Sequence, residues 1–485
     1  MDSASAWERI ERQTLRGRER RTRHNRPGDR PDPSRPVGTD MLPRIKHIVV
    51  LMMENHSFDN YLGTLGRGEG FPLGGDGTPD AENPDSAGAM IRAHHAGSTV
   101  QQEGVPCQSW SATHAQWADG KLNGFVTSVE QASPEADTTA AMSYWTAEDL
   151  PFYHGLARTF PLADRWFSSC LGPTFPNRRF LLAGTANGLM DDLPVNLLDR
   201  PKAGTIMDML ARHKISWVNY RPASDQSEFR RFMEYRRRRT RHHLTSLGRS
   251  LRNPGYVFQR DLQFTAALYP LGMAGYMAHV RSTEQFFADA DSGNLPSFCI
   301  VDPDFGSFSE ESPQDIRKGE SFAAEVINRV THGPAWADTL LIWTYDEHGG
   351  YYDHVVPPAA VPPDDVPGRS RVAHPSPLHS LLKVLSPSYV RHAKQLVEGP
   401  NAYDNYGFRV PAVVVSPYAR PDCVLSDVFD HTSILKLVEE KWNLPALTRR
   451  DAAATAPLGA LDLTAPPSFL TPPELPAPAL AWGTW

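Results

Sequence analysis

Cysteine is scarce in this sequence, and it contains no long apolar run. The 485 residues include four cysteines, at positions 107, 170, 299 and 423, and no two of them form a Cys-x-x-Cys pair. This spacing argues against a zinc ribbon and against a disulfide-dense secreted scaffold. The apolar run over 48–53 is too short to cross a bilayer, which takes about 20 residues.

Basic residues are outnumbered by acidic ones. Lys and Arg total 49 against 56 Asp and Glu, which gives a formal net charge of −7. This mild acidity argues against a general nucleic-acid binder, so we expect no nucleic-acid partner. Residues 1–43 form an Arg-rich arm without the apolar segment that a secretory signal requires. We therefore expect a flexible arm and a cytoplasmic location, with export by an unusual route as the alternative.

Four short and almost continuously apolar runs predict strands that are buried on both faces. They span 45–53, 297–301, 339–345 and 411–415. Helical patterns lie between and after them, at 144–158, 204–213, 319–332 and 431–442. Strands that alternate with helices predict a mostly parallel sheet covered by helices on both faces. We expect one large α/β domain over residues 44–451.

Three segments depart from this pattern. Residues 64–106 are rich in Gly, Asp and Pro and predict an irregular insertion. Residues 228–252 hold nine arginines, which are typical of a solvated helix face or flexible insertion. The alternative is a patch for acidic lipid headgroups or other polyanions, and thus a peripheral membrane contact. Residues 452–485 form a Pro/Ala-rich tail.

Polar side chains follow two of the predicted strands. Glu54 and Asn55 come directly after the first apolar run, and Asp346 and Glu347 come directly after the third. Ligands of parallel α/β sheets bind beyond the carboxyl ends of the strands, and oxygen ligands suit hard cations. Two adjacent carboxylates repel each other unless a cation neutralises them, which favours metal binding at 346–347. For Glu54 and Asn55 taken alone, capping of the next helix is the better interpretation.

Two further segments carry reactive side chains. The Gly172-Pro173 pair predicts a turn that leads into Thr174, which is either a nucleophile or a helix cap. Arg178 follows in the same segment and is a natural partner for a phosphate oxygen. His431 stands before an amphipathic run and either starts a helix without chemistry or reaches the site.

Together these stretches resemble the bacterial phosphoesterase family that contains phosphatidylcholine-type phospholipases C and a related acid phosphatase. The similar stretches occur in the family's order from about 44 to 451 and include IKHIVVLMMENHSFDNYLG, GPTFPNRR and TLLIWTYDEHGGYYDHVVPP. The resemblance implies an alkaline phosphatase-like three-layer α/β sandwich with long loop insertions. It also implies a nucleophile at Thr174 and a divalent metal, either Ca, Mg, Mn or Zn, held by Glu54, Asn55, Asp346 and Glu347.

The remaining site residues are expected around this metal. We expect His114, His354 and Arg178 to contact phosphate or transfer protons, and His348, His431 and Asn177 to help bind the substrate. Two positions depart from the family's pattern, because Gln108 and Glu311 stand where the family often has histidines. Glu311 adds negative charge near a site for a phosphate, unless it faces away or binds the metal.

The main functional hypothesis is metal-dependent hydrolysis of phosphate esters through a phosphothreonine intermediate. A phospholipase C that acts on phosphatidylcholine-type phospholipids is the first choice, since a Thr nucleophile is more like that branch of the family. A broad-specificity acid phosphatase, acting on small phosphoesters, is the alternative. A catalytically weakened protein that binds anionic lipid or another polyanion is the second alternative. The oligomeric state is left open.

Overall fold

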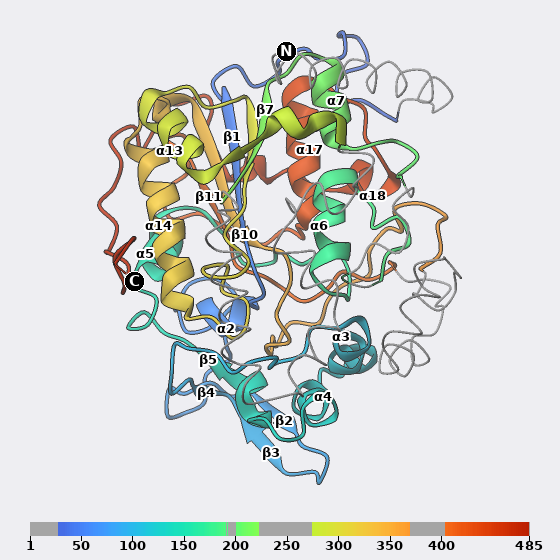
Figure 1. The fold of residues 1–485 in the computed structure, drawn as a ribbon, viewed down its shortest axis with the longest axis vertical. Helices are drawn as coiled ribbons and strands as arrows, with labels where there is room; N and C mark the ends of the chain where they lie inside the picture. The colour runs from blue at the N-terminus through green and yellow to red at the C-terminus, as the bar shows by residue number, and fades with distance from the viewer. Residues whose placement is uncertain (1–27, 191, 193–199, 223–273, 369–402, 485) are drawn as a thin grey trace, which may run out of the picture.

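The computed structural model describes residues 28–484 except 191, 193–199, 223–273 and 369–402. Eight strands of the described chain form one central sheet (Figure 1). In order across the sheet they are β12 (Val424–Leu425), β6 (Leu162–Ala163), β11 (Ala412–Val415), β10 (Thr339–Tyr345), β1 (His47–Met53), β9 (Phe298–Val301), β7 (Trp217–Arg221) and β8 (Val280–Ser282). All four predicted strands lie in this sheet, and three of them, β10, β1 and β9, are neighbours at its centre.

The sheet is mostly parallel, as the sequence predicts. β1 pairs in parallel with β10 on one side and β9 on the other, and β7 continues the parallel series. β11 is the exception, because it runs antiparallel to both β10 and β6. The amino end of β11, rather than its carboxyl end, therefore lies at the edge where β1 and β10 end. Consequently Ser416, after β11, lies at the opposite edge, where its hydroxyl donates to the carbonyl of Thr339 at 3.0 Å.

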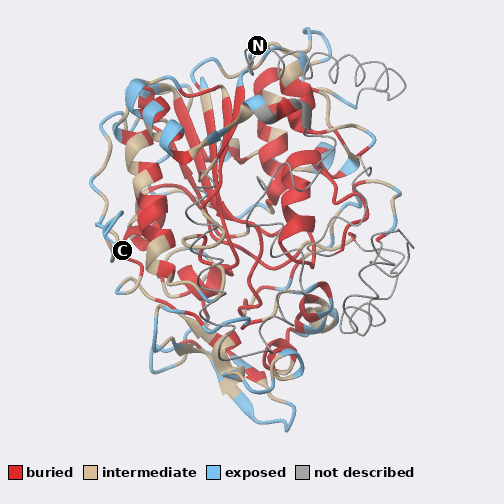
Figure 2. Cartoon of the chain, in the orientation of Figure 1, coloured by how far each residue is buried: buried red, intermediate tan, exposed pale blue. Residues whose placement is uncertain are grey.

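Helices cover both faces of the sheet and form a three-layer arrangement (Figure 1). One layer contains α5 (Pro151–Thr159), α13 (Thr283–Ser292) and α14 (Ile316–His332). The other contains α6 (Thr174–Ala183), α7 (Ile206–Arg212), α17 (His431–Trp442) and α18 (Arg449–Ala453). The strands and the inner helix faces are buried (Figure 2). The α/β class predicted from the sequence is thus confirmed.

One predicted helix begins later than expected. The apolar pattern over 144–158 contains the strand β5 (Ser143–Tyr144) and a turn before α5 starts at Pro151. In this turn the Thr146 backbone N–H donates to Asp149 Oδ2 at 2.9 Å. A proline at the first helical position has a suitable φ and lacks only an N–H that would be unpaired anyway. Pro151 therefore marks the start of α5 better than the apolar spacing does.

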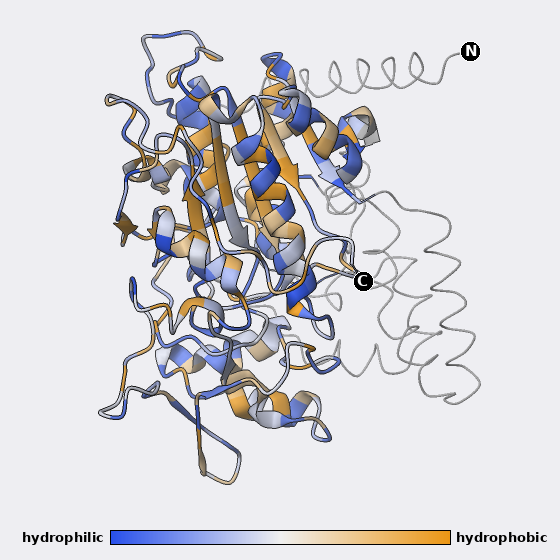
Figure 3. Ribbon diagram, turned by 90° about the vertical axis from the view of Figure 1, so that its left-hand side faces the viewer, coloured by the Kyte–Doolittle hydropathy of each residue, from blue (hydrophilic) through white to orange (hydrophobic). Residues whose placement is uncertain are grey.

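A smaller part of the molecule lies beyond the carboxyl ends of the central strands (Figures 1 and 3). It contains α2 (Phe58–Leu62), β2 (Glu82–Pro84), β3 (Met90–Arg92), β4 (His94–His95), α3 (Trp110–Trp117) and α4 (Phe125–Ala132). The predicted insertion over 64–106 consists of loops and these short strands. A second apolar cluster, which includes Leu122, Phe125 and Phe408, lies in this part.

The C-terminal segment packs on the domain by specific contacts. Phe469 accepts a hydrogen bond from Trp336 Nε1 at 2.8 Å and donates its own N–H to the carbonyl of Pro417 at 3.0 Å. Trp482 packs against the rings of Phe308 and Phe322. The Arg-rich insertion at 228–252 and residues 1–27 of the arm lie outside the described residues. Within the described ranges, no helix is both long enough and apolar enough to cross a membrane.

Candidate active site

Glu54 and Asn55 follow β1 directly and are almost fully buried. Neither caps the next helix, because Ser57 is the N-cap of α2. Asn55 adopts a left-handed backbone conformation with φ 71°. Its carbonyl is so close to Gly349 that a Cβ on that glycine would lie 1.9 Å from the oxygen. The glycine after Glu347 and His348 thus lets the two strand ends meet, which brings Asn55 next to the second carboxylate pair.

Asp346 and Glu347 follow β10 and are also buried. Because β1 and β10 are parallel, with Met53 opposite Tyr345, the four predicted ligands emerge side by side from one edge of the sheet. The Asp346 N–H donates to the Met53 carbonyl at 3.3 Å, which continues the pairing beyond the strands. The structure therefore brings all four predicted metal ligands together.

The polar atoms of these residues form a site that suits a cation. Glu54 Oε2 is buried and has no hydrogen-bond partner among the described residues. The Asn55 side-chain oxygen also faces carboxylate oxygens, since an amide nitrogen in its place would donate to Asp346 Oδ1 at 3.1 Å and to Glu347 Oε1 at 2.7 Å. Oxygens that converge in this way repel one another unless a cation lies between them. The residues present thus fit the divalent metal that the resemblance implies.

The raised pKa values of two of the carboxylates also indicate a site that suits a cation. Burial, and then the charges of Glu311 and Asp346, raise the pKa of Glu54 well above its usual range. Burial, and then the charge of Asp346, raise the pKa of Glu347 in the same way. His348 Nδ1 lies 3.2 Å from Glu347 Oε2, but burial lowers the pKa of His348 to about 3, so this imidazole is neutral and forms no ion pair. A bound divalent cation would offset the excess negative charge.

Thr174 is the first residue of α6, and the turn before it delivers its hydroxyl to this cluster. Pro173 occupies the N-cap position, so Thr174 does not cap the helix. The Thr174 hydroxyl donates to Asn55 Oδ1 at 3.3 Å. Asn177 holds the turn, since its amide donates to the carbonyls of Gly172 at 2.7 Å and Pro173 at 3.1 Å. Asn177 therefore positions Thr174 through the turn that precedes it. Its amide makes no described contact with the carboxylates of the predicted metal ligands.

Arg178 lies one helical turn after Thr174 and is buried. Its guanidinium donates to Asp346 Oδ2 at 2.9 Å and to Asp302 Oδ1 at 2.8 Å. The remaining donors reach the carbonyls of Met52 and Met53, both at 3.2 Å. In this arrangement Arg178 holds a predicted metal ligand and the end of β1 in place, where the sequence predicts a phosphate contact.

Two of the predicted histidines contact the cluster, and a third packs on Trp110. His431 begins α17, and its Nε2 donates to the Asp346 carbonyl at 2.7 Å, while His348 Nε2 donates to Gln116 Oε1 at 2.8 Å. These bonds anchor the two histidines within the protein. His114 packs on Trp110, and a Cβ on Gly172 would lie 2.8 Å from the Trp110 ring. The His114 Nδ1 donates to the Trp110 carbonyl at 2.8 Å, which leaves Nε2 as an acceptor.

His354 lies in a different cluster. Its Nδ1 is 2.6 Å from Asp59 Oδ2, and these two residues and Asp353 place ligand atoms within 4.8 Å of one another. The distances between these atoms are compatible with a bound metal ion. However, the Arg409 guanidinium already donates to Asp59 at 3.0 Å and to Asp353 at 2.9 Å. Since Arg409 already pairs with both carboxylates, this cluster suits a metal less well than the Glu54 cluster does.

Three acidic residues near the site were missed or left open by sequence reasoning. Asp302 follows β9 directly, so the rule that picks out Glu54 and Asp346 could have found it. Asp192 accepts from the Phe175 backbone N–H at 3.0 Å, next to Thr174, and no local pattern signals it. Glu311 is partly exposed, and its charge acts on both Glu54 and Glu347.

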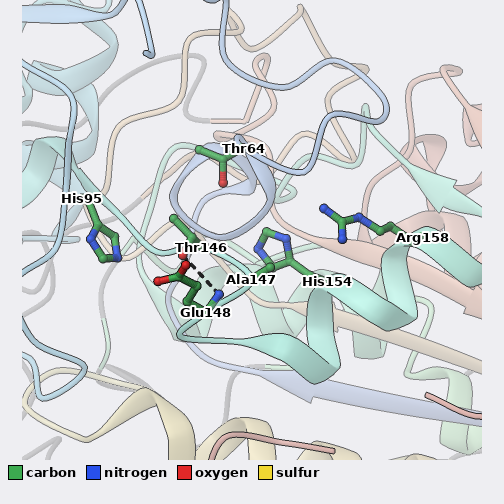
Figure 4. Close-up of a pocket in the computed structure, with 7 residues that line it drawn as sticks. All are labelled: Thr64, His95, Thr146, Ala147, Glu148, His154 and Arg158. Atoms are coloured by element: carbon green, nitrogen blue, oxygen red, sulfur yellow. Dashed lines mark hydrogen bonds between the residues drawn. The ribbon is translucent and has the colours of Figure 1, made fainter. Parts of the chain in front are cut away.

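A surface pocket lies apart from these residues (Figure 4). Its volume is about 390 Å³, and its lining contains His95, His154 and Arg158 as well as Thr64, Thr146, Ala147 and Glu148. The His154 ring is buried, and its Nε2 donates to the Tyr61 carbonyl at 2.9 Å. Burial lowers the pKa of His154 to about 4. The lining includes neither the four predicted ligands nor Thr174, so this pocket is not the predicted active site.

Comparison with known proteins identifies the family to which the chain is similar. The model of the Phosphoesterase family matches residues 45–445. Phospholipase C B of Mycobacterium tuberculosis is 30% identical over 463 residues, covering 90% of this chain and 80% of that protein. Non-specific phospholipase C6 of Arabidopsis thaliana is 28% identical, covering 84% and 71%. Non-hemolytic phospholipase C of Pseudomonas aeruginosa is 27% identical, covering 90% and 59%.

Among solved structures, a protein of the alkaline phosphatase superfamily from Vibrio parahaemolyticus aligns over 93% of this chain and 78% of its own. The TM-score is 0.36 and the sequence identity is 9%.

Proposed function

The chain belongs to the phosphoesterase family, and on this basis we propose that it is a metal-dependent phospholipase C that acts on phosphatidylcholine-type phospholipids. The observation that carries the proposal is that the Thr174 hydroxyl contacts Asn55, one of four buried oxygen-bearing residues at the carboxyl ends of β1 and β10. A hydroxyl at this position can attack phosphorus. The names of the similar proteins favour a phospholipid substrate over a small phosphomonoester.

Glu54, Asn55, Asp346 and Glu347 would hold the divalent cation next to the Thr174 hydroxyl. When bound, the cation supplies positive charge that lowers the pKa of this hydroxyl and offsets charge on the phosphoryl group. Arg178 would keep Asp346 oriented, since it donates to this carboxylate at 2.9 Å and is itself held by three other acceptors. His431 would fix the backbone at the same residue.

The reaction would proceed in two displacements. Thr174 Oγ1 attacks phosphorus, the bond from phosphorus to the glycerol oxygen breaks, and diacylglycerol leaves with a proton. Water then attacks phosphothreonine and releases the phosphorylated headgroup, which restores Thr174. The Nε2 of His114 remains an acceptor and is the group that we assign to proton transfer in one of these steps.

The test is a paired substrate assay with metal add-back. The full chain is treated with a chelator, and Ca²⁺, Mg²⁺, Mn²⁺ or Zn²⁺ is then restored singly. We expect release of diacylglycerol from phosphatidylcholine in mixed micelles with at least one metal and no release with the chelator alone. Release of phosphate from p-nitrophenyl phosphate without release of diacylglycerol would instead establish the acid phosphatase alternative. Lipid binding without hydrolysis under any of these conditions would establish the weakened binder.

A further inference from the structure

The first turn of α6 carries Thr174, but the residue before the helix cannot cap it. Pro173 occupies the N-cap position, and its side chain makes no capping hydrogen bond. The first N–H groups of a helix have no partner within the helix and must be paired elsewhere. Pro176 has no N–H, and the Asn177 N–H donates to the Pro173 carbonyl at 3.4 Å. The N–H of Phe175, directly after Thr174, is therefore one that needs an acceptor from outside this turn.

Asp192 supplies this acceptor from a later part of the chain. Its Oδ1 accepts the Phe175 N–H at 3.0 Å. Gly184 ends α6 in a left-handed conformation with φ 68°, which allows the chain to turn away from the helix. The chain after this turn is held against α6, because Arg179 donates to the Ala186 carbonyl at 3.1 Å. A carboxylate is favourable beside the first turn, since the N-terminus of a helix carries partial positive charge.

The backbone around Thr174 is thus held on both sides. Asn177 fixes the turn before it by donating to the carbonyls of Gly172 and Pro173. Asp192 fixes the residue after it. Between these two contacts, the Thr174 hydroxyl donates to Asn55 Oδ1 at 3.3 Å. If the first turn of the helix shifts, the hydroxyl moves with it, and a misplacement of about 1 Å can lower a rate by about a hundredfold.

We propose that Asp192 is a positioning residue, which holds the first turn of α6 so that the Thr174 hydroxyl faces the predicted metal ligands. Its carboxylate takes the place of the helix cap that Pro173 cannot provide. This inference rests on the proposed function and goes beyond it, because it adds a residue that acts on the nucleophile through the backbone. Asp192 is not thereby a catalytic residue, since its described bond is with a backbone N–H.

The test compares Asp192→Ala with Asp192→Asn at saturating metal, on phosphatidylcholine and on p-nitrophenyl phosphate. Asp192 is only partly buried, so both variants should fold. For the ester that the wild type hydrolyses, Asp192→Ala should lower kcat by about 10- to 100-fold and leave KM within about threefold. The reason is that the nucleophile is displaced while the contacts to the substrate remain. A raised KM with unchanged kcat would overturn the inference, since Asp192 would then act on substrate binding.

Asp192→Asn separates the hydrogen bond from the charge. The charge of Asp192 contributes to the raised pKa of Glu347, so Asp192→Ala removes two effects at once. Asp192→Asn removes the charge but keeps an oxygen that can accept the Phe175 N–H, and it should restore kcat to within about fivefold of the wild type. If both variants lost kcat equally, the charge would be responsible and the positioning role would be wrong.

Ser282→Ala is the matched control for the loss of a helix cap. Ser282 is the N-cap of α13, which has ten residues as α6 does, and its hydroxyl accepts the Gln285 N–H at 3.2 Å. Ser282→Ala should lower the temperature of thermal unfolding without changing kcat. If Asp192→Ala also lowered only this temperature and kept the wild-type kcat, its bond would be a structural cap alone and the inference would fall.

Metal binding provides a readout that does not depend on turnover. Calorimetric titration with Mn²⁺ should give the same affinity for the wild type, Asp192→Ala and Asp192→Asn within about fivefold, because Asp192 is inferred to hold α6 and not the metal. A fall of at least about tenfold in both variants would contradict this. A wild type that hydrolyses neither ester with any metal would instead refute the proposed function itself.

Discussion

Thr174 is distinguished from other buried threonines by what its hydroxyl faces. It begins α6 and lies 3.3 Å from Asn55 Oδ1, within the cluster of oxygen ligands. Thr174→Ala should reduce the turnover of phosphatidylcholine by at least ~10³-fold, because it removes the hydroxyl that we propose as the nucleophile. Thr174→Ser keeps the hydroxyl and should retain activity within about tenfold of the wild type. Steady-state rates of diacylglycerol release measure both.

Thr283 offers a matched control for this substitution. It is also the first residue of a helix, α13, and is also buried, and its hydroxyl has no partner among the described residues. Thr283→Ala should therefore leave kcat unchanged. If Thr174→Ala kept the wild-type rate while its thermal unfolding matched that of Thr283→Ala, Thr174 would not be the nucleophile.

At the scale of elements, Arg178 ties α6 to the ends of β1, β9 and β10. It pairs with Asp302 after β9 and Asp346 after β10, and all three side chains are buried. Arg178→Met should lower the free energy of unfolding by about 3–5 kcal/mol, because two buried carboxylates lose their partner. Urea denaturation of the metal-free protein measures this loss.

The control is an arginine whose ion pairs are partly exposed. Arg329 pairs with Asp291 at 2.5 Å and Glu325 at 2.6 Å on the surface of α14. Arg329→Met should cost only about 0–1 kcal/mol. Equal losses for the two variants would mean that Arg178 does not hold the strand ends together. If Arg178→Met left the free energy of unfolding unchanged but raised KM, the result would favour the phosphate contact that the sequence predicts for Arg178.

The contact between Gly349 and Asn55 tests how the two strand ends meet. Gly349→Ala would place a Cβ 1.9 Å from the Asn55 carbonyl oxygen, so the ligand loop must shift. We expect metal affinity to fall by at least about tenfold, because a displaced Asn55 cannot face Asp346 and Glu347 together. Isothermal titration with Mn²⁺ or Zn²⁺ measures this affinity.

Gly66 separates the steric effect from backbone strain. Its φ is +73°, close to the +69° of Gly349, but a Cβ there would meet no atom within 4 Å. Gly66→Ala therefore carries the same left-handed strain without the collision. Its metal affinity should match that of the wild type, and a similar fall in both variants would refute the contact as the cause.

The strands that carry the site could be predicted from the sequence only in part. Continuous apolar runs predict β1, β9 and β10, and acidic residues directly after them mark one edge of the sheet. The apolar run of β11 carries no information on its direction, so its antiparallel pairing could not be predicted. Nor could the pairing of Arg409 with Asp59 and Asp353, since these residues are far apart in the sequence and meet only in the fold.

At the scale of the whole molecule, length and motif order set the class of protein. The phosphoesterase family and the class of phosphoric ester hydrolase, both expected from the resemblance, are confirmed by a match over 45–445 and by related phospholipases C. The roles of single residues stay predictions, because a role depends on distances that motifs do not contain. Arg178 illustrates this, because the sequence predicts a phosphate contact while its described partners are carboxylates and carbonyls.

Buried carboxylates away from the ligand cluster give the folded protein a characteristic pH dependence. Burial raises the pKa of Glu310 to about 8 even though Tyr153, Tyr345 and Tyr61 lower it by hydrogen bonding, and burial raises the pKa of Glu320 to about 7. The usual value for both is 4.5. Between pH 4.5 and 8 the folded chain therefore holds more protons than the unfolded chain. The free energy of unfolding should fall as pH rises through this interval.

Glu310→Gln isolates the larger of these contributions. It removes the titration while keeping a similar shape, so its free energy of unfolding should fall less than that of the wild type between pH 5 and 8.5. One pKa unit corresponds to about 1.4 kcal/mol, so the difference between the two slopes should amount to a few kcal/mol at most. Urea denaturation at several pH values, with chelator present, measures the slopes, and Glu135→Gln, an exposed carboxylate, should follow the wild type. Wild-type stability that rises from pH 5 to 8.5, or a Glu310→Gln slope equal to that of the wild type, would show that Glu310 is ionised throughout, with its tyrosine hydrogen bonds outweighing its burial.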